Sequence, residues 1–309
     1  MSLITVLAGG VGAARFLQGL VKVVPEEEIT VIVNTGDDIQ LHGLHISPDL
    51  DIVAYTLAGI VDEEKGWGVH RDTFHCIEML QRYGHETWFN LGDRDFATHI
   101  YRTCLLRQGL SLSEVTNGIR QALGLRLKII PMTNDRFETR IVTDIGTLHL
   151  QEYLVKRHAK DNVIDVLFEG SEKAKPAPRV IDSILNASLI IVSPSNPIVS
   201  IGTILSVNNV RGTLRKTKAR VVAITPIIGK APVKGPADKL MKGLGLEVSA
   251  YSVARLYQDF LDVFILDFMD RDEKEKIEQL GLQVIVTNTL MKTQEDKVRL
   301  AKTVLKLIK

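Results

Sequence analysis

Short runs of apolar, often β-branched residues recur along the chain, and they constrain its fold more than any other feature. Within each run, residues at both even and odd positions are apolar, as expected of parallel strands that are buried on both faces. Longer helical patterns separate the runs, which favours an α/β fold with a Rossmann-like, doubly wound and mostly parallel sheet. The runs are residues 3–7, 29–33, 189–192, 221–224, 263–266 and 284–286.

The middle of the chain departs from this alternation. The pattern is helical from Trp67 to about Leu125, and Asp93 and Ser111 stand where helix N-caps are expected. Ser111 and Glu114 also have the spacing of a capping box. We therefore expect a helical segment that does not belong to the regular strand–helix alternation.

Alternating polar and apolar residues follow that helical segment and predict short strands joined by turns. These strands are expected at residues 127–130, 139–143 and 147–155. The length of 309 residues allows about two domain units. We expect a single α/β domain over residues 1–309, in which residues 65–185 form an inserted, mainly helical sub-lobe with short β-strands.

The charge and the hydropathy of the chain exclude several classes of protein. Lys and Arg total 38 and Asp and Glu total 37, so the formal charge is only +1. A dedicated nucleic-acid binder carries a basic excess, so no nucleic-acid partner is expected. No apolar run approaches the roughly 20 residues that span a bilayer, and the N-terminus lacks the basic segment of a signal peptide. We expect a cytoplasmic protein that does not associate with membranes.

Cysteine and histidine show no pattern typical of a zinc site or a disulfide framework. Cys76 and Cys104 lie far apart in helical patterns, so we expect buried, reduced thiols. The histidines of this region have no metal-ligand spacing; they are His70, His75, His85 and His99.

A glycine-rich segment follows the first predicted strand and leads into a helix. Gly9, Gly10 and Gly12 let the backbone approach a phosphate at a helix N-terminus. The segment is not a P-loop, because no Gly-Lys-Ser/Thr follows it, and Arg15 stands at the third glycine position of the dinucleotide fingerprint. A phosphate or nucleotide site is favoured over a purely structural turn.

Four carboxylates come shortly afterwards, beginning at the end of the second predicted strand. Asp37 and Asp38 lie at the sheet edge where ligands of open parallel sheets bind, and two carboxylates can hold Mg²⁺. An Asx-rich turn is the alternative. Asp49 and Asp51 are two residues apart, before a helix that we expect to begin near Ile52. One of them can cap that helix, and the other can be a general base or a metal ligand.

Three further segments have the polar, Gly/Pro-rich composition of ligand-binding loops. Trp88, Phe89 and Asn90 precede a helix and could stack on a planar heterocycle, or could simply belong to the core. The second and third segments follow later strands, so they should meet the glycine-rich segment at one sheet edge. Their candidate ligand-binding residues are Ser193, Ser195, Asn196, Lys230 and Lys234. Together these loops indicate a phosphorylated, nucleotide-containing ligand and phosphoryl-type transfer assisted by Mg²⁺.

These same segments resemble one family, the 2-phospho-L-lactate transferases of coenzyme F-420 biosynthesis. Val11 departs from the pattern of that family, in which Thr often stands at this position; a backbone role tolerates the change. The matching segments are residues 7–12, 34–38, 42–44, 47–51, 88–95, 97–99, 131–133, 151–153, 193–197 and 233–239.

The resemblance implies a reaction with two substrates. The donor is a lactyl diphosphoguanosine, and the acceptor is the deazaflavin Fo. The terminal ribityl hydroxyl attacks the phosphorus that bears lactate, GMP leaves, and the form of coenzyme F-420 without glutamates results. Related bacterial enzymes use a phosphoenolpyruvate donor, and the sequence does not distinguish the two. The resemblance also implies a Mg²⁺ cofactor and a methanogenic host, and a homodimer is expected because it is common for such folds.

The resemblance assigns roles to residues of this chain. Asp51, with Asp49, is the catalytic candidate, which orients or deprotonates the acceptor hydroxyl. Lys234 neutralises the leaving phosphate. The Mg²⁺ candidates are Asp37, Asp38 and Asp49. The donor-binding candidates are Gly9, Gly10, Gly12, Ser193, Ser195 and Asn196, and the deazaflavin-binding candidates are Trp88, Phe89 and Asn90.

Two rival functions stay open at this point. One is a nucleotide-sugar-binding regulatory protein of the same superfamily without turnover, against which the segments 88–95 and 131–133 count. The other is a nicotinamide-dependent oxidoreductase. Arg15 in the glycine-rich segment, and Asn34 where a ribose-binding acid often ends the second strand, disfavour it.

Overall fold

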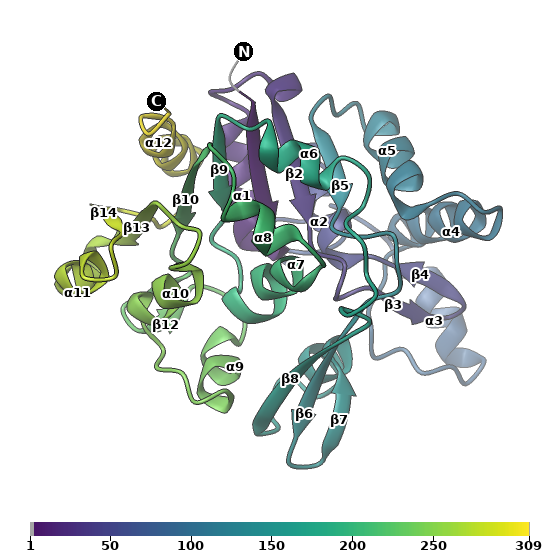
Figure 1. Cartoon of the computed structure of the whole chain (residues 1–309). Helices are drawn as coiled ribbons and strands as arrows, with labels where there is room; N and C mark the ends of the chain where they lie inside the picture. Colours follow the sequence, from purple (N-terminus) through teal and green to yellow (C-terminus); the bar gives the residue numbers. More distant parts are fainter. Residues whose placement is uncertain (1–2, 309) are drawn as a thin grey trace.

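A seven-stranded parallel sheet forms the centre of the molecule (Figure 1). The computed structural model describes residues 3–308. The order of the strands is β14-β13-β10-β9-β1-β2-β5, and all neighbours pair in parallel. The strands are β1 (Ile4–Ala8), β2 (Ile29–Val33), β5 (Lys128–Pro131), β9 (Leu189–Val192), β10 (Arg220–Ile224), β13 (Val263–Asp267) and β14 (Gln283–Thr287). This is the doubly wound, Rossmann-like order with one additional edge strand, as the apolar runs predict.

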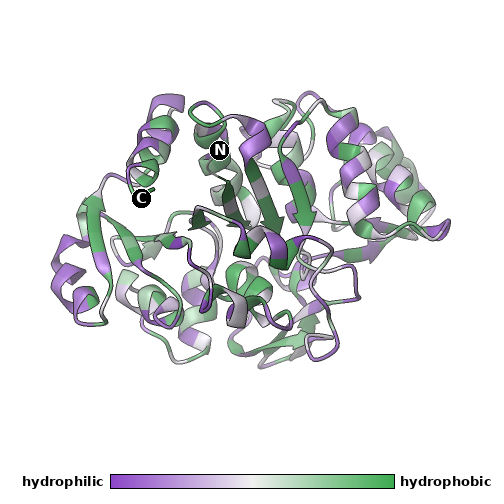
Figure 2. Cartoon of the chain, turned by 45° about the horizontal axis from the view of Figure 1, so that its top comes forward, coloured by the Kyte–Doolittle hydropathy of each residue, from purple (hydrophilic) through white to green (hydrophobic). Residues whose placement is uncertain are grey.

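The strands are buried on both faces because successive side chains enter two different cores. Leu7 of β1 packs into the core on one face, whereas Val6 and Ala8 pack into the core on the other. Figure 2 shows the central strands as the most hydrophobic segments of the chain. This explains why apolar residues stand at both even and odd positions of the strand runs, with Thr5 and Thr30 as exceptions.

Helices cover both faces of the sheet. One face is covered by α1 (Gly10–Leu20), α2 (Pro48–Leu57) and α12 (Gln294–Leu305). The other is covered by α6 (Val180–Leu185), α7 (Thr203–Ser206), α8 (Val210–Leu214), α9 (Ala237–Gly243), α10 (Ala250–Tyr257) and α11 (Lys274–Glu278). Among the helices formed by residues 3–308, none is long and apolar enough to cross a membrane.

The interval 65–185 does not form one continuous lobe, because β5 within it pairs with β2 in the main sheet. Two separate excursions leave the sheet (Figure 1). The first, between β2 and β5, comprises the hairpin β3 (Ile39–Leu41) and β4 (Leu44–Ile46), and then α3 (His75–Arg82), α4 (Asp93–Arg107) and α5 (Leu112–Ala122), whereas α2 within the same interval packs on the sheet. The second is an antiparallel sheet of β6 (Glu138–Thr143), β7 (Gly146–His149) and β8 (Val163–Glu169). A short ribbon, β11 (Ile227–Ile228) and β12 (Ala231–Pro232), follows β10.

Some local predictions of the sequence are confirmed and others are wrong. Ser111 and Glu114 form the expected capping box of α5. The strand expected at 147–155 ends at His149 and is followed by a helical turn. The cysteines lie in α3 and α4, but both are exposed and not buried.

Asp93 caps a different helix from the one expected. It is the first residue of α4, yet its carboxylate accepts hydrogen bonds from the backbone N–H groups of His75 and Cys76 at the start of α3. Asp72 in turn accepts from Arg94 at the start of α4. The two helix N-termini are therefore capped reciprocally, an exchange that depends on tertiary packing.

Candidate active site

The glycine-rich segment packs directly against the loop that follows β9, where the order of the strands reverses. The Ser195 hydroxyl donates to the Gly9 carbonyl at 2.7 Å, and the Ser193 hydroxyl donates to the Leu7 carbonyl at 2.7 Å. A Cβ atom at Gly12 would lie 2.2 Å from the Pro194 carbonyl oxygen, so only glycine allows this approach. Both serine hydroxyls therefore hold the two loops together.

Asn196 also has an internal partner. Its side-chain oxygen accepts hydrogen bonds from the N–H groups of Ile198 and Val199, at the start of the helical segment Pro197–Gly202. Ser193, Ser195 and Asn196 thus stabilise the loop after β9 where the order of the strands reverses. A role for these residues in contacting the donor stays a prediction.

A carboxylate of this chain occupies the start of the first helix. The Gly10 backbone N–H donates to Asp49 Oδ1 at 2.9 Å, and Gly10 has φ +71°, a left-handed conformation that favours glycine. A Cβ atom at Gly9 would lie 2.8 Å from Asp49 Oδ2. The helix α2 begins at Pro48, earlier than expected, so Asp49 and Asp51 both lie in its first turn.

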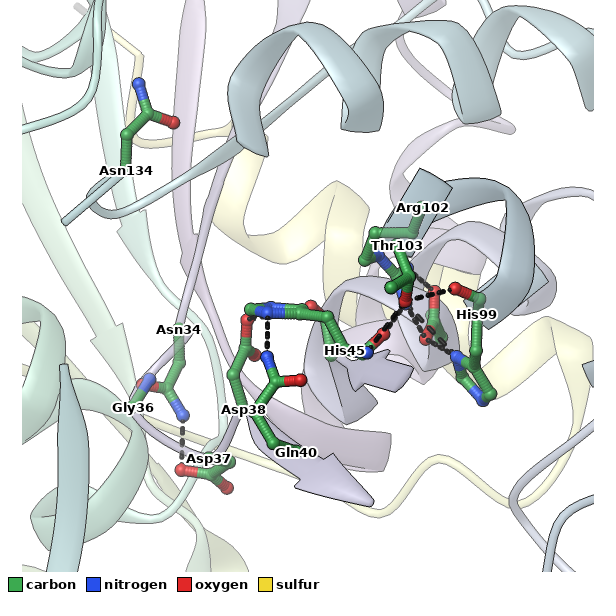
Figure 3. A network of polar contacts seen from close by, with 12 residues as sticks. Asn34, Gly36, Asp37, Asp38, Gln40, His45, His99, Arg102, Thr103 and Asn134 are labelled. Atoms are coloured by element: carbon green, nitrogen blue, oxygen red, sulfur yellow. Dashed lines mark hydrogen bonds and ion pairs between the residues drawn. The ribbon is translucent and has the colours of Figure 1, made fainter. Parts of the chain in front are cut away.

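Two acids converge on the side chain of Asn34, at the carboxyl end of β2. The Asn34 amide donates to Asp37 Oδ1 at 2.8 Å and to Asp49 Oδ2 at 2.9 Å, and all three residues are buried (Figure 3 shows the contact with Asp37). Burial, followed by the negative charge of Asp49, holds the pKa of Asp37 well above its ordinary value. Burial likewise raises the pKa of Asp49, against hydrogen bonds from Asn34 and Gly10 that lower it.

Asp38 has different partners from its neighbour. Its Oδ2 accepts from the Ser47 hydroxyl at 2.7 Å and lies 2.8 Å from His45 Nε2 in β4 (Figure 3 shows Asp38 and His45). Its Oδ1 is buried and has no hydrogen-bond partner within residues 3–308. Asp38 therefore ties the β3–β4 hairpin to the end of β2 and keeps one oxygen without a partner.

The carboxylate pair fits a hard divalent cation. Mg²⁺ is typically bound by one or two carboxylates together with waters and substrate phosphates, and Asp37 with Asp49 supplies such a pair. A positive ion there would offset the burial that raises both pKa values. Within residues 3–308 no group of three or more acidic, histidine or cysteine side chains could hold a metal by itself. The pair therefore suits a cation that shares its ligands with substrate, and Asp38 stays a predicted third ligand.

Asp51 is bound to an arginine that the sequence analysis missed. Arg102 Nη1 donates to Asp51 Oδ2 at 3.1 Å, and Arg102 Nη2 donates to Asp51 Oδ1, with both residues buried. Arg102 also contacts His99 Nδ1 at 3.2 Å. Asp95, His99 and Arg102 lie on one face of α4 at intervals of three and four residues (Figure 3 shows His99 and Arg102). This helical spacing of polar residues is the signal that could have revealed them.

A cavity of about 300 Å³ opens above this network between α2, α4 and the segment that precedes α4. Its walls are mainly apolar or aromatic, and its polar residues include Asp51, Asp95 and His99. The Tyr55 hydroxyl, which also lines it, donates to Asp95 Oδ1 at 2.9 Å. The apolar and aromatic walls include Ile52, Trp67, Phe89 and Leu91. We call this space the aromatic cavity; its volume suits a small planar ligand.

The residues expected to bind the deazaflavin are divided between two cavities. Phe89 and Asn90 line the aromatic cavity. Trp88 lines a second, more polar cavity of about 810 Å³ between the β3–β4 hairpin and β6. Trp67, which was not singled out from the sequence, contributes the tryptophan of the aromatic cavity.

Lys234 lies apart from these acids, in the loop that follows β12. Its Nζ would be 2.3 Å from a Cβ atom at Gly66, so the ammonium group sits against the backbone there. Desolvation and the nearby Arg15 lower the pKa of Lys234. Lys230, the other lysine expected at this edge, precedes β12 in a left-handed conformation with φ 60°.

Comparison with known proteins identifies the family. A family model described as 2-phospho-L-lactate transferase CofD matches residues 4–305. A 2-phospho-L-lactate transferase from Methanocaldococcus jannaschii is 44% identical over 98% of this chain and 97% of its own length. A phosphoenolpyruvate transferase from Streptomyces coelicolor is 46% identical over 90% of this chain and 89% of its own length. The resemblance implied a methanogenic host. Because the family also has relatives in Streptomyces, membership of the family does not establish such a host.

Among solved structures, a UPF0052-family protein from Bacillus halodurans is similar over 98% of each chain, with a TM-score of 0.64 and 14% identity. At that identity the likeness concerns the fold alone, and it agrees with the doubly wound sheet. The family is identified by the relatives found from sequence. The relative from Methanocaldococcus jannaschii is 44% identical to this chain over nearly its full length, compared with 14% for the solved structure. The chain belongs to the 2-phospho-L-lactate transferase CofD family.

Proposed function

We propose that the chain transfers the 2-phospho-L-lactate group from a lactyl diphosphoguanosine to the ribityl hydroxyl of the deazaflavin Fo, with release of GMP. The family, and relatives named 2-phospho-L-lactate transferase, support this activity. The structural observation that carries it is an aromatic cavity lined by Asp51, which stands two residues after Asp49 of the Asp37–Asp49 pair. Neither the comparisons nor the geometry supports the regulatory or the nicotinamide-dependent alternative.

The aromatic cavity is the proposed acceptor site. Phe89 and Trp67 offer aromatic faces to a flat deazaflavin ring, and Asn90 adds a donor and an acceptor at the rim. Asp51 also lines this cavity, and its carboxylate is held in place because both of its oxygens accept from Arg102. We therefore assign Asp51 to orienting the ribityl hydroxyl.

The Asp37–Asp49 pair is the proposed Mg²⁺ site, with Asp38 as a further candidate ligand. When bound, the ion would neutralise charge on the transferring phosphoryl group. The chain itself positions this pair: the Asn34 amide donates to both carboxylates, and the Gly10 N–H fixes Asp49 relative to the first helix.

The proposed step is a displacement at phosphorus. The hydroxyl oxygen of Fo forms a bond to the phosphorus that bears lactate, and the bond from that phosphorus to the bridging oxygen of GMP breaks. GMP leaves with the electron pair of that bond. The hydroxyl proton passes to a carboxylate, for which Asp49 and Asp51 are the candidates in the first turn of α2.

The donor acyl group is a separate part of the proposal. The relative from Methanocaldococcus jannaschii is named for phospholactate, and the relative from Streptomyces coelicolor, with similar identity to this chain, is named for phosphoenolpyruvate. Turnover of the purified chain with each donor in turn discriminates between them. The proposed homodimer is tested by sedimentation equilibrium of the same preparation.

The first experiment is a fluorescence titration of the protein with Fo, with and without GDP and Mg²⁺. Micromolar binding, weakened at least tenfold by Asn90→Ala or Phe89→Ala, is the expected result. A matched control is Tyr83→Ala, an exposed aromatic residue at the end of α3 that lies outside the aromatic cavity. Absence of Fo binding under every condition would reject the acceptor assignment and with it the proposed reaction.

A further inference from the structure

A small cavity lies along the first two turns of α1, next to the aromatic cavity. Its volume is about 80 Å³, which is room for a few water molecules or for one phosphate group. Ile52 lines both cavities, so they are adjacent across a single side chain. We call this space the basic cavity; its charged and amide-bearing residues are Arg15, Gln18, Glu63, Lys292 and Lys297.

The cations of the basic cavity lack carboxylate partners. Within residues 3–308, no ion pair within 4.0 Å involves Arg15, Lys292 or Lys297. Lys297 is only 7% exposed, and its Nζ donates to Gln18 Oε1 at 2.6 Å. Glu63, the acid on the wall, is exposed and contacts Gln18 at 3.5 Å. The buried ammonium group is hydrogen-bonded to an amide and not to an acid, and three cations face a single exposed carboxylate, so the net charge of the cavity lining is positive.

Lys234 adds a fourth cation at the edge of the same space. Its Nζ lies against Gly66, which lines the basic cavity, and Gly66 has φ +74°. Desolvation and then the charge of Arg15 lower the pKa of Lys234. Desolvation also lowers the pKa of Lys297, where Glu63 acts in the opposite direction and Arg15 in the same one. Arg15 is thus close enough to repel both lysines, a cost that a bound anion would remove.

The glycine-rich segment is less available to a phosphate than its sequence suggests. The N–H of Gly10 already donates to the Asp49 carboxylate, and the loop after β9 covers Gly12. By contrast, the basic cavity has cations without acidic partners and adjoins the proposed acceptor site.

We propose that Arg15, Lys234 and Lys297 form a phosphate-binding subsite that holds one phosphoryl group of a diphosphate ligand. The use of this subsite for the donor in the transfer reaction rests on the proposed function. The anion site itself does not, since it follows from the cavity and its charges. Arg15 supplies a planar guanidinium that can bind two phosphate oxygens, and the lysines supply point charges.

Inorganic pyrophosphate is the probe that tests the subsite without a nucleotide. Calorimetric titration of the full chain is expected to show saturable binding that Arg15→Gln and Lys234→Gln each weaken at least tenfold. Arg15→Lys should recover part of the loss. Lys302→Gln serves as the matched control, because it removes a positive charge from an exposed position of α12 outside the cavity. Parallel titrations with orthophosphate and GDP show whether one phosphate suffices or a nucleotide is needed.

The outcomes separate this inference from the proposed function. Pyrophosphate binding that is absent from the wild type, or equal in the wild type and in both glutamine variants, would overturn the subsite. The glutamine variants should bind Fo within twofold of the wild type, which shows that they are folded. If pyrophosphate binds as expected but Fo does not bind to the wild type, the subsite stands and the transferase proposal fails.

Discussion

At the scale of single residues, the candidate site depends on charges that are buried together. Asp37 and Asp49 share the Asn34 amide, and burial raises the pKa of both. A carboxyl group whose pKa is raised by folding favours the folded state most below its ordinary value, and this contribution is lost as the pH rises through the raised value. The metal-free protein therefore carries electrostatic strain at neutral pH.

Removing one of the two charges should relieve that strain. We expect Asp37→Asn to raise the unfolding temperature of the metal-free protein by a few degrees near pH 8, since ~1 kcal/mol moves a domain of about 150–250 residues by about 2–4 °C and a longer chain by less. The gain should shrink towards pH 4, and transfer activity should be lost. Calorimetry with a chelator across this range checks the prediction. A lower unfolding temperature at every pH would show that the pair is not strained.

Removing one charge of the Asp51–Arg102 pair should lower the stability of the protein, in contrast to the removal of the Asp37 charge. Both side chains are buried, and breaking such a pair by removing one partner costs about 3–5 kcal/mol, because the other charge is left without compensation. We expect Arg102→Met to lose about that much in urea unfolding, and the double variant Arg102→Met with Asp51→Leu to recover a large part. Equal stability of the single and the double variant would contradict the ion-pair interpretation.

At the scale of elements, glycine determines how closely α1 approaches the loop after β9. Gly12→Ala should destabilise the protein, because the new Cβ would meet the Pro194 carbonyl at 2.2 Å and separate the two segments. Gly212 in α8 is the matched control, since it has nothing within 4 Å and no positive φ. Gly212→Ala should be neutral or stabilise by up to about 1 kcal/mol. Thermal unfolding of both variants tests the contrast; equal effects would mean that the close contact is unimportant.

The helices that lie between β2 and β5 begin at residues that are set by different kinds of cap. Ser111 and Glu114 specify the start of α5 through neighbours in sequence, and this start was predicted correctly. A helix start was also expected at Asp93, where α4 begins, but the exchange of caps between Asp72 and Asp93, about twenty residues apart, was not predicted. Local capping is visible in a sequence because its partners are three residues apart, whereas reciprocal capping requires that two helices already pack together.

At the scale of the whole molecule, the two tryptophans are placed in two different cavities. Trp67 lines the aromatic cavity and Trp88 lines the polar cavity beside β6. We expect Fo binding to quench tryptophan fluorescence in the wild type and in Trp88→Phe, and quenching to fall sharply in Trp67→Phe. The reverse pattern would place the acceptor in the polar cavity and move the proposed site to the other side of the hairpin.

The sequence by itself determined six of the seven strands of the main sheet, because strands buried on both faces are apolar at even and odd positions alike; the edge strand β5 was expected in the sub-lobe. It also indicated which loops gather at one edge of the sheet, since parallel strands bring their carboxyl ends together. These features depend on residues that are close in the chain, so a reader of the sequence alone can find the glycine-rich segment and the aspartates.

Only the tertiary structure decided what each of those residues contacts. Asp49 reaches the Gly10 amide, and Asp51 binds Arg102 from a helix that begins about forty residues later. Ser193 and Ser195 donate to the backbone carbonyls of Leu7 and Gly9, 186 residues earlier in the chain in each case. The physical reason is that a hydrogen bond or an ion pair depends on distances of a few ångströms in space, and residues far apart in sequence come within that range only when the helices pack on the sheet.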